Sequence, residues 1–137
     1  MSVTSDFITH LKAQSAITAL VGSGTSARIY PDLVKETASR PCVVVKKVSS
    51  REEMGLAGGL GLFQTVFEVL SLGASRDAAD ALDDTITDIE GGNVTMGSTV
   101  ATEITIDGDR SSGADFAVDG SDQHDYWALT RYSIWHT

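Results

Sequence analysis

Two apolar segments of strand length lie close together in this sequence, at residues 41–48 and 62–72. Both are rich in residues that favour the pleated, half-buried surface of a sheet. In the second segment Phe67 points to one side and Glu68 to the other, as alternation requires. The polar, glycine-rich stretch 49–61 between them is too long for a tight turn. The pattern predicts a long antiparallel β-hairpin with a mobile tip.

Helical patterns lie on both sides of this hairpin. Apolar residues recur at helical spacing before Gly22, which predicts a bent or two-piece helix over residues 5–21. After the hairpin, Ser75 is a candidate N-cap for a second helix. The apolar stripe of that helix consists of Ala79, Leu82, Ile86 and Ile89. A helix with one such stripe is expected to pack on a sheet.

Two further strands are predicted in the C-terminal half. Alternation over residues 100–107, with Val100 and Ile104 on the apolar side, predicts a strand with one buried face. The aromatic run 126–135 predicts a fourth strand, and the Asp-, Gly- and Ser-rich stretch 107–125 a long exposed loop. We therefore expect a single α+β domain over residues 1–137. Its antiparallel four-stranded sheet would carry helices on one face, in the order α-β-β-α-β-β.

The charge of the chain narrows the classes of partner. A formal net charge of −9 disfavours general binding to nucleic acid or to anionic membranes, although DNA could pass such a surface without adhering. The single cysteine, Cys42, lies in an apolar strand and is expected to be a buried, inert thiol. The sequence begins without signal-peptide features and contains no run of membrane-spanning length. We expect assembly in a reducing host cytoplasm and no membrane association.

Motifs that would carry chemistry are missing from the sequence. The glycine-rich stretch 55–61 fits no phosphate-binding pattern and joins two strands instead of opening a helix. Counted from Asp107, a calcium loop would need glycine at Ser112 and glutamate at Val118. The three histidines are far apart, and no nucleophile and base can be named together. We therefore expect no enzymatic activity, no cofactor and no metal.

Two groups of residues are candidates for protein contacts. The hairpin tip mixes charged and apolar residues, so a neighbouring subunit could order it, or it could remain a solvated loop. The candidates in the tip are Arg51, Glu52, Glu53, Met54 and Leu56. The last strand adds Trp127 and Trp135, which are core or interface residues because aromatic side chains are enriched in both places.

Several local patterns, taken with the order of elements, resemble one family. They are Arg28-Ile29-Tyr30-Pro31 after a short helix, Arg40-Pro41 before a Val-rich strand, the strand 64–69, the helix after it, and the aromatic C-terminal strand. Together they resemble the small tail-completion proteins of long-tailed bacteriophages and gene transfer agents, also called tail terminator or tail-to-head joining proteins. The resemblance covers nearly the whole chain as a diffuse pattern, and that family has no catalytic residues to transfer.

The resemblance implies a structural protein of the virion tail, at the interface between head and tail. It implies a homo-oligomeric ring, commonly of six subunits, that caps the head-proximal end of the tail tube and stops tube polymerisation. Its partners would be the tail tube protein and a head-completion or connector protein. DNA would pass through the lumen without specific binding. The acids expected to face that lumen are Glu68, Glu103 and Asp107.

The residues alone are also compatible with two other functional classes of protein. A small α+β ligand-binding or enzymatic domain acting as a dimer would need an apolar pocket with convergent polar groups, and the sequence has no signature for one. Another neck protein or a tail-tube subunit would also serve virion assembly. A tube subunit predicts open-ended stacking of the purified protein, whereas a terminator predicts a closed ring.

Overall fold

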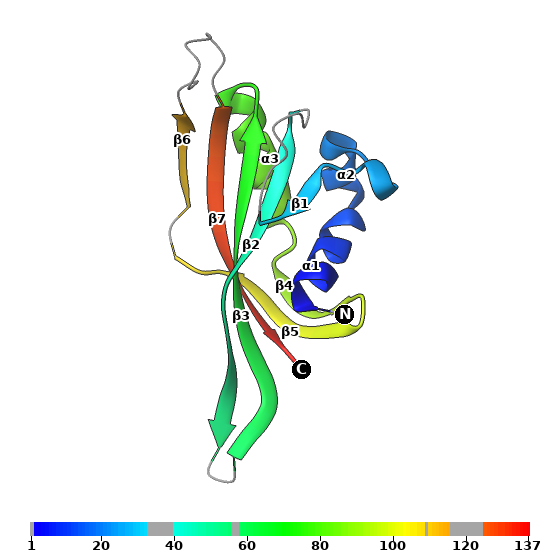
Figure 1. Ribbon diagram of the computed structural model, residues 1–137, viewed down its shortest axis with the longest axis vertical. Helices are drawn as coiled ribbons and strands as arrows, with labels where there is room; N and C mark the ends of the chain where they lie inside the picture. Colours follow the sequence, from blue (N-terminus) through cyan, green and yellow to red (C-terminus); the bar gives the residue numbers. More distant parts are fainter. Residues whose placement is uncertain (1, 33–39, 56–57, 109, 116–124) are drawn as a thin grey trace.

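The computed structural model describes residues 2–32, 40–55, 58–108, 110–115 and 125–137 (Figure 1). The helical elements are α1 (Val3–Lys12), α2 (Ser15–Val21), the short 3-10 turn η1 (Gly24–Ser26) and α3 (Arg76–Thr87). The strands are β1 (Ile29–Pro31), β2 (Cys42–Gly55), β3 (Gly58–Gly73), β4 (Gly91–Met96), β5 (Thr99–Ile106), β6 (Ser111–Asp115) and β7 (Asp125–His136). None of the described helices is long and apolar enough to cross a membrane.

All seven strands form one sheet in the order β1-β2-β3-β7-β5-β4, and β6 also pairs with β7. β1 runs parallel to β2, and the other paired strands are antiparallel. β7 is the central strand. On one side it pairs with β3, and on the other its first half pairs with β6 and its second half with β5. The long hairpin predicted from the sequence is the β2–β3 pair.

The mixed α+β class and the four long strands agree with the sequence prediction, but the prediction of a four-stranded sheet is wrong. β1, β4 and β6 were not among the four predicted strands. β4 begins Gly-Gly-Asn, and β6 reads Ser-Ser-Gly-Ala-Asp within the stretch predicted to be a loop. Such residues have low strand propensity. They adopt strand geometry because they pair with the stronger strands β5 and β7.

The two-piece N-terminal helix is confirmed as α1 and α2, although it begins earlier than residue 5. Ser2 is the N-cap of α1, and its hydroxyl accepts a hydrogen bond of 3.1 Å from the backbone N–H of Ser5. Gly22 ends α2 with a φ of 87°, in the left-handed region that favours glycine. The predicted cap of α3 is also confirmed, since Ser75 accepts from the N–H of Ala78 at 3.2 Å.

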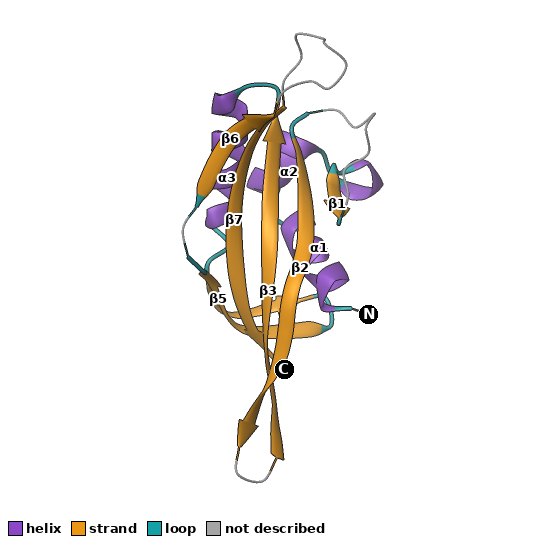
Figure 2. Cartoon of the chain, turned by 60° about the vertical axis from the view of Figure 1, so that its left-hand side comes forward, coloured by secondary structure: helices purple, strands orange, loops and turns teal. Residues whose placement is uncertain are grey.

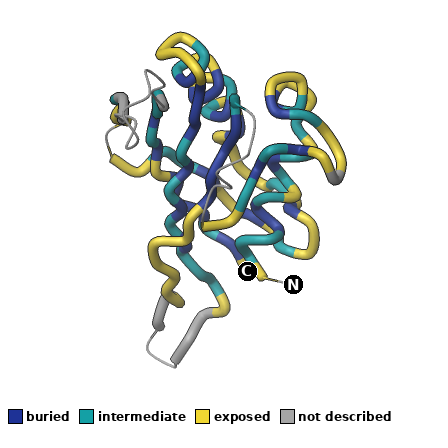
Figure 3. Tube along the Cα trace, turned by 45° about the horizontal axis from the view of Figure 1, so that its top comes forward, coloured by how far each residue is buried: buried dark blue, intermediate teal, exposed yellow. Residues whose placement is uncertain are grey.

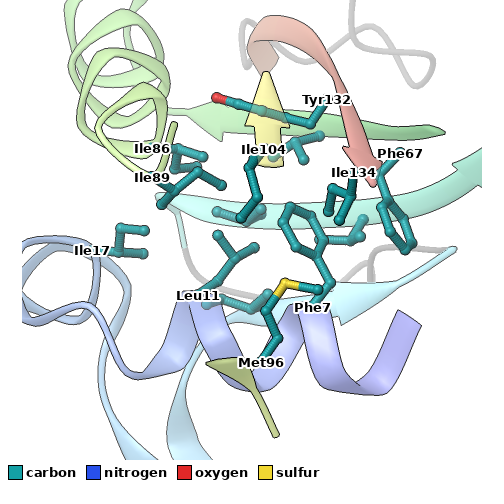
Figure 4. Close-up of a cluster of buried hydrophobic side chains, with 14 of the residues drawn as sticks. Phe7, Leu11, Ile17, Phe67, Ile86, Ile89, Met96, Ile104, Tyr132 and Ile134 are labelled. Atoms are coloured by element: carbon teal, nitrogen blue, oxygen red, sulfur yellow. The ribbon is translucent and has the colours of Figure 1, made fainter. Parts of the chain in front are cut away.

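The three α-helices lie on one face of the sheet, which we call the covered face (Figure 2). Phe7 of α1 stacks on Phe67 of β3, with ring centroids 4.7 Å apart. Tyr132 of β7 is fully buried beside them, and burial raises the pKa of its phenol. Figure 4 shows how these rings meet aliphatic side chains from α3 and β5. The core that they form includes Leu11, Ile17, Val43, Val69, Leu82, Ile86, Met96, Ile104 and Ile134.

A bulge in β5 changes which of its residues face the core. The pairing with β7 shifts between Ala101 and Glu103. As a result Ala101 is fully buried, whereas Val100 is 49 % exposed. The prediction that Val100 belongs to the buried side is therefore wrong, although Ile104 is buried as expected. One extra residue in a strand reverses the alternation beyond it.

Two buried carboxylates connect the helices to the sheet. Asp83 of α3 accepts hydrogen bonds from Thr130 Oγ1 of β7 at 2.8 Å and from Arg110 Nε at 3.0 Å. Arg110 also binds Asp84 at 2.6 Å, and these bonds to Asp84 and Asp83 raise the pKa of its guanidinium. The ion pairs hold Arg110, the residue before β6, against α3.

The second carboxylate, Asp6 of α1, holds the β4–β5 turn. It is fully buried and accepts from Thr99 Oγ1 at 2.6 Å and from Ser98 Oγ at 2.9 Å. Gly97 lies so close that an added Cβ would be 2.6 Å from the Oδ1 atom of Asp6. The hydrogen bond from Thr99, with that from Ser98, lowers the pKa of Asp6 despite its burial.

We expect Asp6→Ala to lower the free energy of unfolding by about 1–3 kcal/mol at neutral pH, because two hydroxyls lose their acceptor. The folded-state pKa of Asp6 is lowered, so the stabilisation is present above its ordinary pKa and is lost as the pH falls through the folded-state value. Urea unfolding at neutral and acidic pH measures this. The gap between wild type and variant should narrow in acid, and Asp77→Ala, at an exposed carboxylate in α3, is the control. A gap that is independent of pH would contradict the assignment.

Candidate functional site

The opposite face of the sheet, which we call the open face, carries no helix among the described elements (Figure 2). Strand alternation sends every second residue of β2, β3 and β7 to this face. Near one end the register aligns Val44 with Leu70 and Leu70 with Leu129. A small apolar cluster, separate from the main core, consists of Cys42, Val44 and Leu72 with Tyr30, Leu70 and Trp127 against it. As predicted, the thiol of Cys42 is buried.

A shallow groove of about 360 Å³ crosses this apolar end. Its walls are Asp32, Val44, Lys46, Glu68, Leu70, Trp127 and Leu129. Trp127 can lie across β6 because Gly113 has no side chain, since a Cβ there would be 2.7 Å from the indole. The lining combines apolar side chains with three charged ones, and no nucleophile and base meet there among the described residues. Such a surface is suited to contact with another protein chain.

A row of charged side chains lies next to the groove. Lys46, Glu68 and Arg131 are aligned across β2, β3 and β7. The guanidinium of Arg131 binds one carboxylate oxygen of Glu68 through Nε at 3.1 Å and Nη2 at 2.7 Å. The side chain of Glu68 is 24 % exposed. Glu68 therefore presents an ion pair and not a free negative charge, which weakens any repulsion of DNA by this residue.

Beyond Phe63 the hairpin has no further partner among the described strands. β7 ends its pairing where His136 faces Phe63, and the residue of β2 opposite Phe63 is Glu52. Residues 53–55 and 58–62 thus form a two-stranded hairpin arm that projects from the body (Figure 1). The connection is much shorter than the predicted 49–61, because the strands continue to Gly55 and from Gly58. An isolated two-stranded ribbon is only marginally stable in water, which fits a segment ordered by contact with another subunit.

The root of the arm contains a chain of hydrogen bonds across three strands. His136 Nε2 of β7 lies 2.8 Å from Thr65 Oγ1 of β3, and that oxygen lies 2.9 Å from Ser50 Oγ of β2. Phe63 stacks on the His136 ring with centroids 5.7 Å apart. These contacts set the direction in which the arm leaves the sheet. Sequence reasoning missed them because His136 matches no metal or catalytic spacing.

The predicted contact residues of the tip occupy the base of the arm and the arm itself. Arg51 and Glu52 are exposed; Arg51 Nε donates to Gln64 at 3.0 Å, and Glu52 accepts from the backbone N–H of Gly61 at 3.2 Å. The backbone of Glu53 and Met54 belongs to β2, but their side chains lie outside the described residues. Leu56 also lies outside the described residues. The contact role of all five stays a prediction.

Both predicted tryptophans lie on the open face and are half-buried. They are eight residues apart on β7, or about 26 Å along an extended strand. Trp127 lines the groove, whereas Trp135 is aligned with Gln64 and Glu103. They therefore belong to different parts of the open face and do not form one aromatic site.

The acids predicted to face a lumen are also separated. Glu103 and Asp107 are exposed near the β5 side of the sheet, while Glu68 is paired in its centre. Their lumen role stays a prediction. Sequence reasoning missed Val44, Leu70 and Leu129 as residues that line the groove on the open face. The sequence did contain a signal for this apolar surface, because β3 carries apolar residues on both of its faces.

Comparisons with known proteins identify a family for this chain and a solved structure with a similar fold. Residues 6–135 match the family model described as "Tail completion protein gp17". In fold, the chain is similar to a chain in the virion of a native gene transfer agent (GTA) particle, with a TM-score of 0.63 and 13 % sequence identity. That alignment covers 99 % of this chain and 96 % of the other. At this identity the likeness concerns the fold alone. No curated protein sequence matches this one significantly.

We expect Thr65→Val to loosen the root of the arm, because it removes the hydroxyl that links His136 to Ser50 while keeping the shape of the side chain. Hydrogen exchange of the backbone amides at 49–52 should become faster, and the free energy of unfolding should fall by about 1–3 kcal/mol. Thr102→Val, at an exposed position of β5, is the matched control. Unchanged exchange at 49–52 would show that the hydrogen-bond chain does not hold the arm.

Proposed function

The chain belongs to the tail completion protein gp17 family, and from this membership we propose that it forms a closed ring at the head-proximal end of the tail tube. The family is one of structural proteins of the virion tail, and the protein is such a protein. In the proposed role the ring stops tube polymerisation and joins the tail to the head connector. Six subunits are the number that the family resemblance predicts.

The observation that carries this proposal is the asymmetry of the subunit, whose two faces and two ends differ. One face of the sheet is covered by three helices, the other is open and partly apolar, and the hairpin arm projects from one end (Figures 1 and 2). A closed ring of identical subunits needs two different surfaces that complement each other. A subunit with distinct faces and a projecting arm can supply them.

In this proposal each partner has a binding site on the arm or at one end of the ring. The arm would dock on the tail tube protein or on an adjacent subunit, where pairing would stabilise a ribbon that is marginal alone. The head-completion or connector protein would bind the other end of the ring. With a net charge of −9, a lumen formed by this chain would repel phosphates, so DNA would slide through without specific binding.

The alternative functions differ from this proposal in measurable ways. A dimeric ligand-binding or enzymatic domain would need convergent polar groups in a pocket. The groove on the open face is mostly apolar, and its charged residues include Glu68, which is already bound by Arg131. A tail-tube subunit or another neck protein would share the family's structural role but not the closed ring. A tube subunit would stack without limit.

Native mass spectrometry and negative-stain images of the purified protein, alone and with purified tail tubes, test the proposal. We expect a closed ring near six copies, formed either alone or on the tube end. Because tube ends are the template for such a ring, a monomer that assembles only on tubes also supports it. If the protein itself forms open-ended tubes, it is a tail-tube subunit instead. A stable dimer, or no assembly even on tubes, would contradict the ring.

We expect deletion of residues 52–60 to give a folded protein that no longer caps tubes. The deletion retains the pairing of Arg51 with Gln64, and Gly61, with a φ of 71°, is suited to the new turn. Circular dichroism and thermal unfolding check the fold, and tube length in a tail assembly reaction gives the result. Tubes of normal length with the folded deletion variant would show that the arm is not the docking element.

A further inference from the structure

We propose that neighbouring copies in the ring meet edge to edge, with Lys46 and Arg51 of one copy facing Asp107 and Glu103 of the next. The contact would run along the free edge of β2 on one copy and, on the other, along the side of the sheet formed by the edge strand β4 and the end of β5. This inference rests on the proposed ring, and it names the surfaces that close it. The occupant of the β2 edge is therefore a second copy of this chain.

Two rows of side chains cross the open face, and each has a cation at one end and an acid at the other. The first row consists of Arg51, Gln64, Trp135 and Glu103, aligned strand by strand. The second row consists of Lys46, Glu68, Arg131 and Asp107. Asp107 joins this row through its N–H, which donates to the backbone oxygen of Arg131 at 2.8 Å. Both cations lie on the β2 side and both acids on the β5 side.

The edge of β2 is open where these cations lie. β1 covers β2 only at residues 43–45, and no described strand continues the sheet beside Lys46 and the residues after it. Seven consecutive residues, 46–52, are exposed, although 42–45 are all buried (Figure 3). Val48, at the bulge, is 43 % exposed. A long strand edge that no described strand covers is a natural template for another chain.

The other end of each row is free to reach a neighbour. Glu103 is exposed, and its partner in the edge strand β4 is Gly92, which has no side chain. Glu103 is therefore the last side chain of its row. Asp107 is likewise exposed and follows the last residue of β5. In the strand order β2 lies towards one end of the sheet and β5 towards the other, with β3 and β7 between them, so the two charged ends of each row are separated by the width of the sheet.

Side-by-side repetition of the subunit brings these ends together. β2 and β5 are antiparallel, because each successive pairing from β2 through β3 and β7 to β5 reverses direction. Arg51 of one copy would therefore meet Glu103 of the next while Lys46 meets Asp107. Each contact uses two different surfaces, as a head-to-tail ring requires. Two opposite pairs in matching order also fix the register of the contact.

This assignment competes with the lumen role of the same acids. A carboxylate that binds the next subunit cannot also face a DNA channel as a free charge. The two roles predict different results when the charge of these acids is neutralised or reversed. If the acids form a subunit contact, the ring is lost. If they face the lumen, the ring stays intact and genome ejection is altered. Oligomeric state therefore distinguishes the two roles.

The test is charge reversal, measured as the fraction of protein in rings by native mass spectrometry under the condition in which wild type forms them. We expect Arg51→Glu and Glu103→Arg each to lower that fraction about tenfold or more, because every contact around the ring gains a repulsion. The double variant Arg51→Glu/Glu103→Arg should recover rings, because each contact regains an opposite pair. Lys46→Asp and Asp107→Lys repeat the test on the second row.

The controls are Arg76→Glu and Asp88→Arg, which make the same charge changes at exposed residues of α3 and beyond its end, outside both rows. They should form rings as wild type does. Single reversals that leave the ring fraction unchanged, or a double variant that does not recover it while remaining folded by circular dichroism, would overturn the edge contact and leave the ring proposal intact. If wild type forms no ring even on tail tubes, the ring proposal itself fails.

Discussion

The pairing of β3 with β7 determines the rest of the structure. Eleven consecutive residue pairs join the two strands, from Phe63 opposite His136 to Gly73 opposite Tyr126. This register puts Phe67 and Tyr132 under α1 and sends their neighbours Glu68 and Arg131 to the open face. A slip of one residue would exchange the two faces, so that the ion pair would enter the core and the aromatic rings would face solvent. Such a slip is costly, because it would bury two charges.

Polar anchors then place the weaker elements on this framework. α1 is short, and β4 and β6 have little intrinsic preference for strand geometry. Asp6 attaches the β4–β5 turn to α1, and Asp83 attaches both β7 and the start of β6 to α3 through Thr130 and Arg110. Each carboxylate is buried but has at least two hydrogen-bond donors, which offsets the cost of its desolvation. The fold is thus assembled from strong local pairing and a few long-range polar contacts.

This division explains what could be predicted from the sequence. The long strands and the helices have periodic apolar patterns, so their positions and the N-cap Ser75 were predictable. β4, β6 and the bulge at Ala101 were not, because their geometry comes from pairing partners distant in sequence. The residues of the candidate site also divide into those that were predictable and those that were not. Arg51, Glu52 and both tryptophans were recognisable as surface or interface candidates, whereas the pairing of Glu68 with Arg131 depends on a register between residues 63 positions apart.

The free edge of β2 shows how one feature can both prevent and permit assembly. An uncovered strand edge invites pairing with any extended chain, and natural sheets commonly protect such edges with charge and bulges. β2 has both: Lys46, Lys47 and Arg51 lie along the edge, and the register shifts between Lys47 and Ser49. Two identical β2 edges would bring these cations together and repel each other. The acidic side of β5 would not be repelled, so the same charges that block symmetric edge-to-edge pairing leave a head-to-tail contact open.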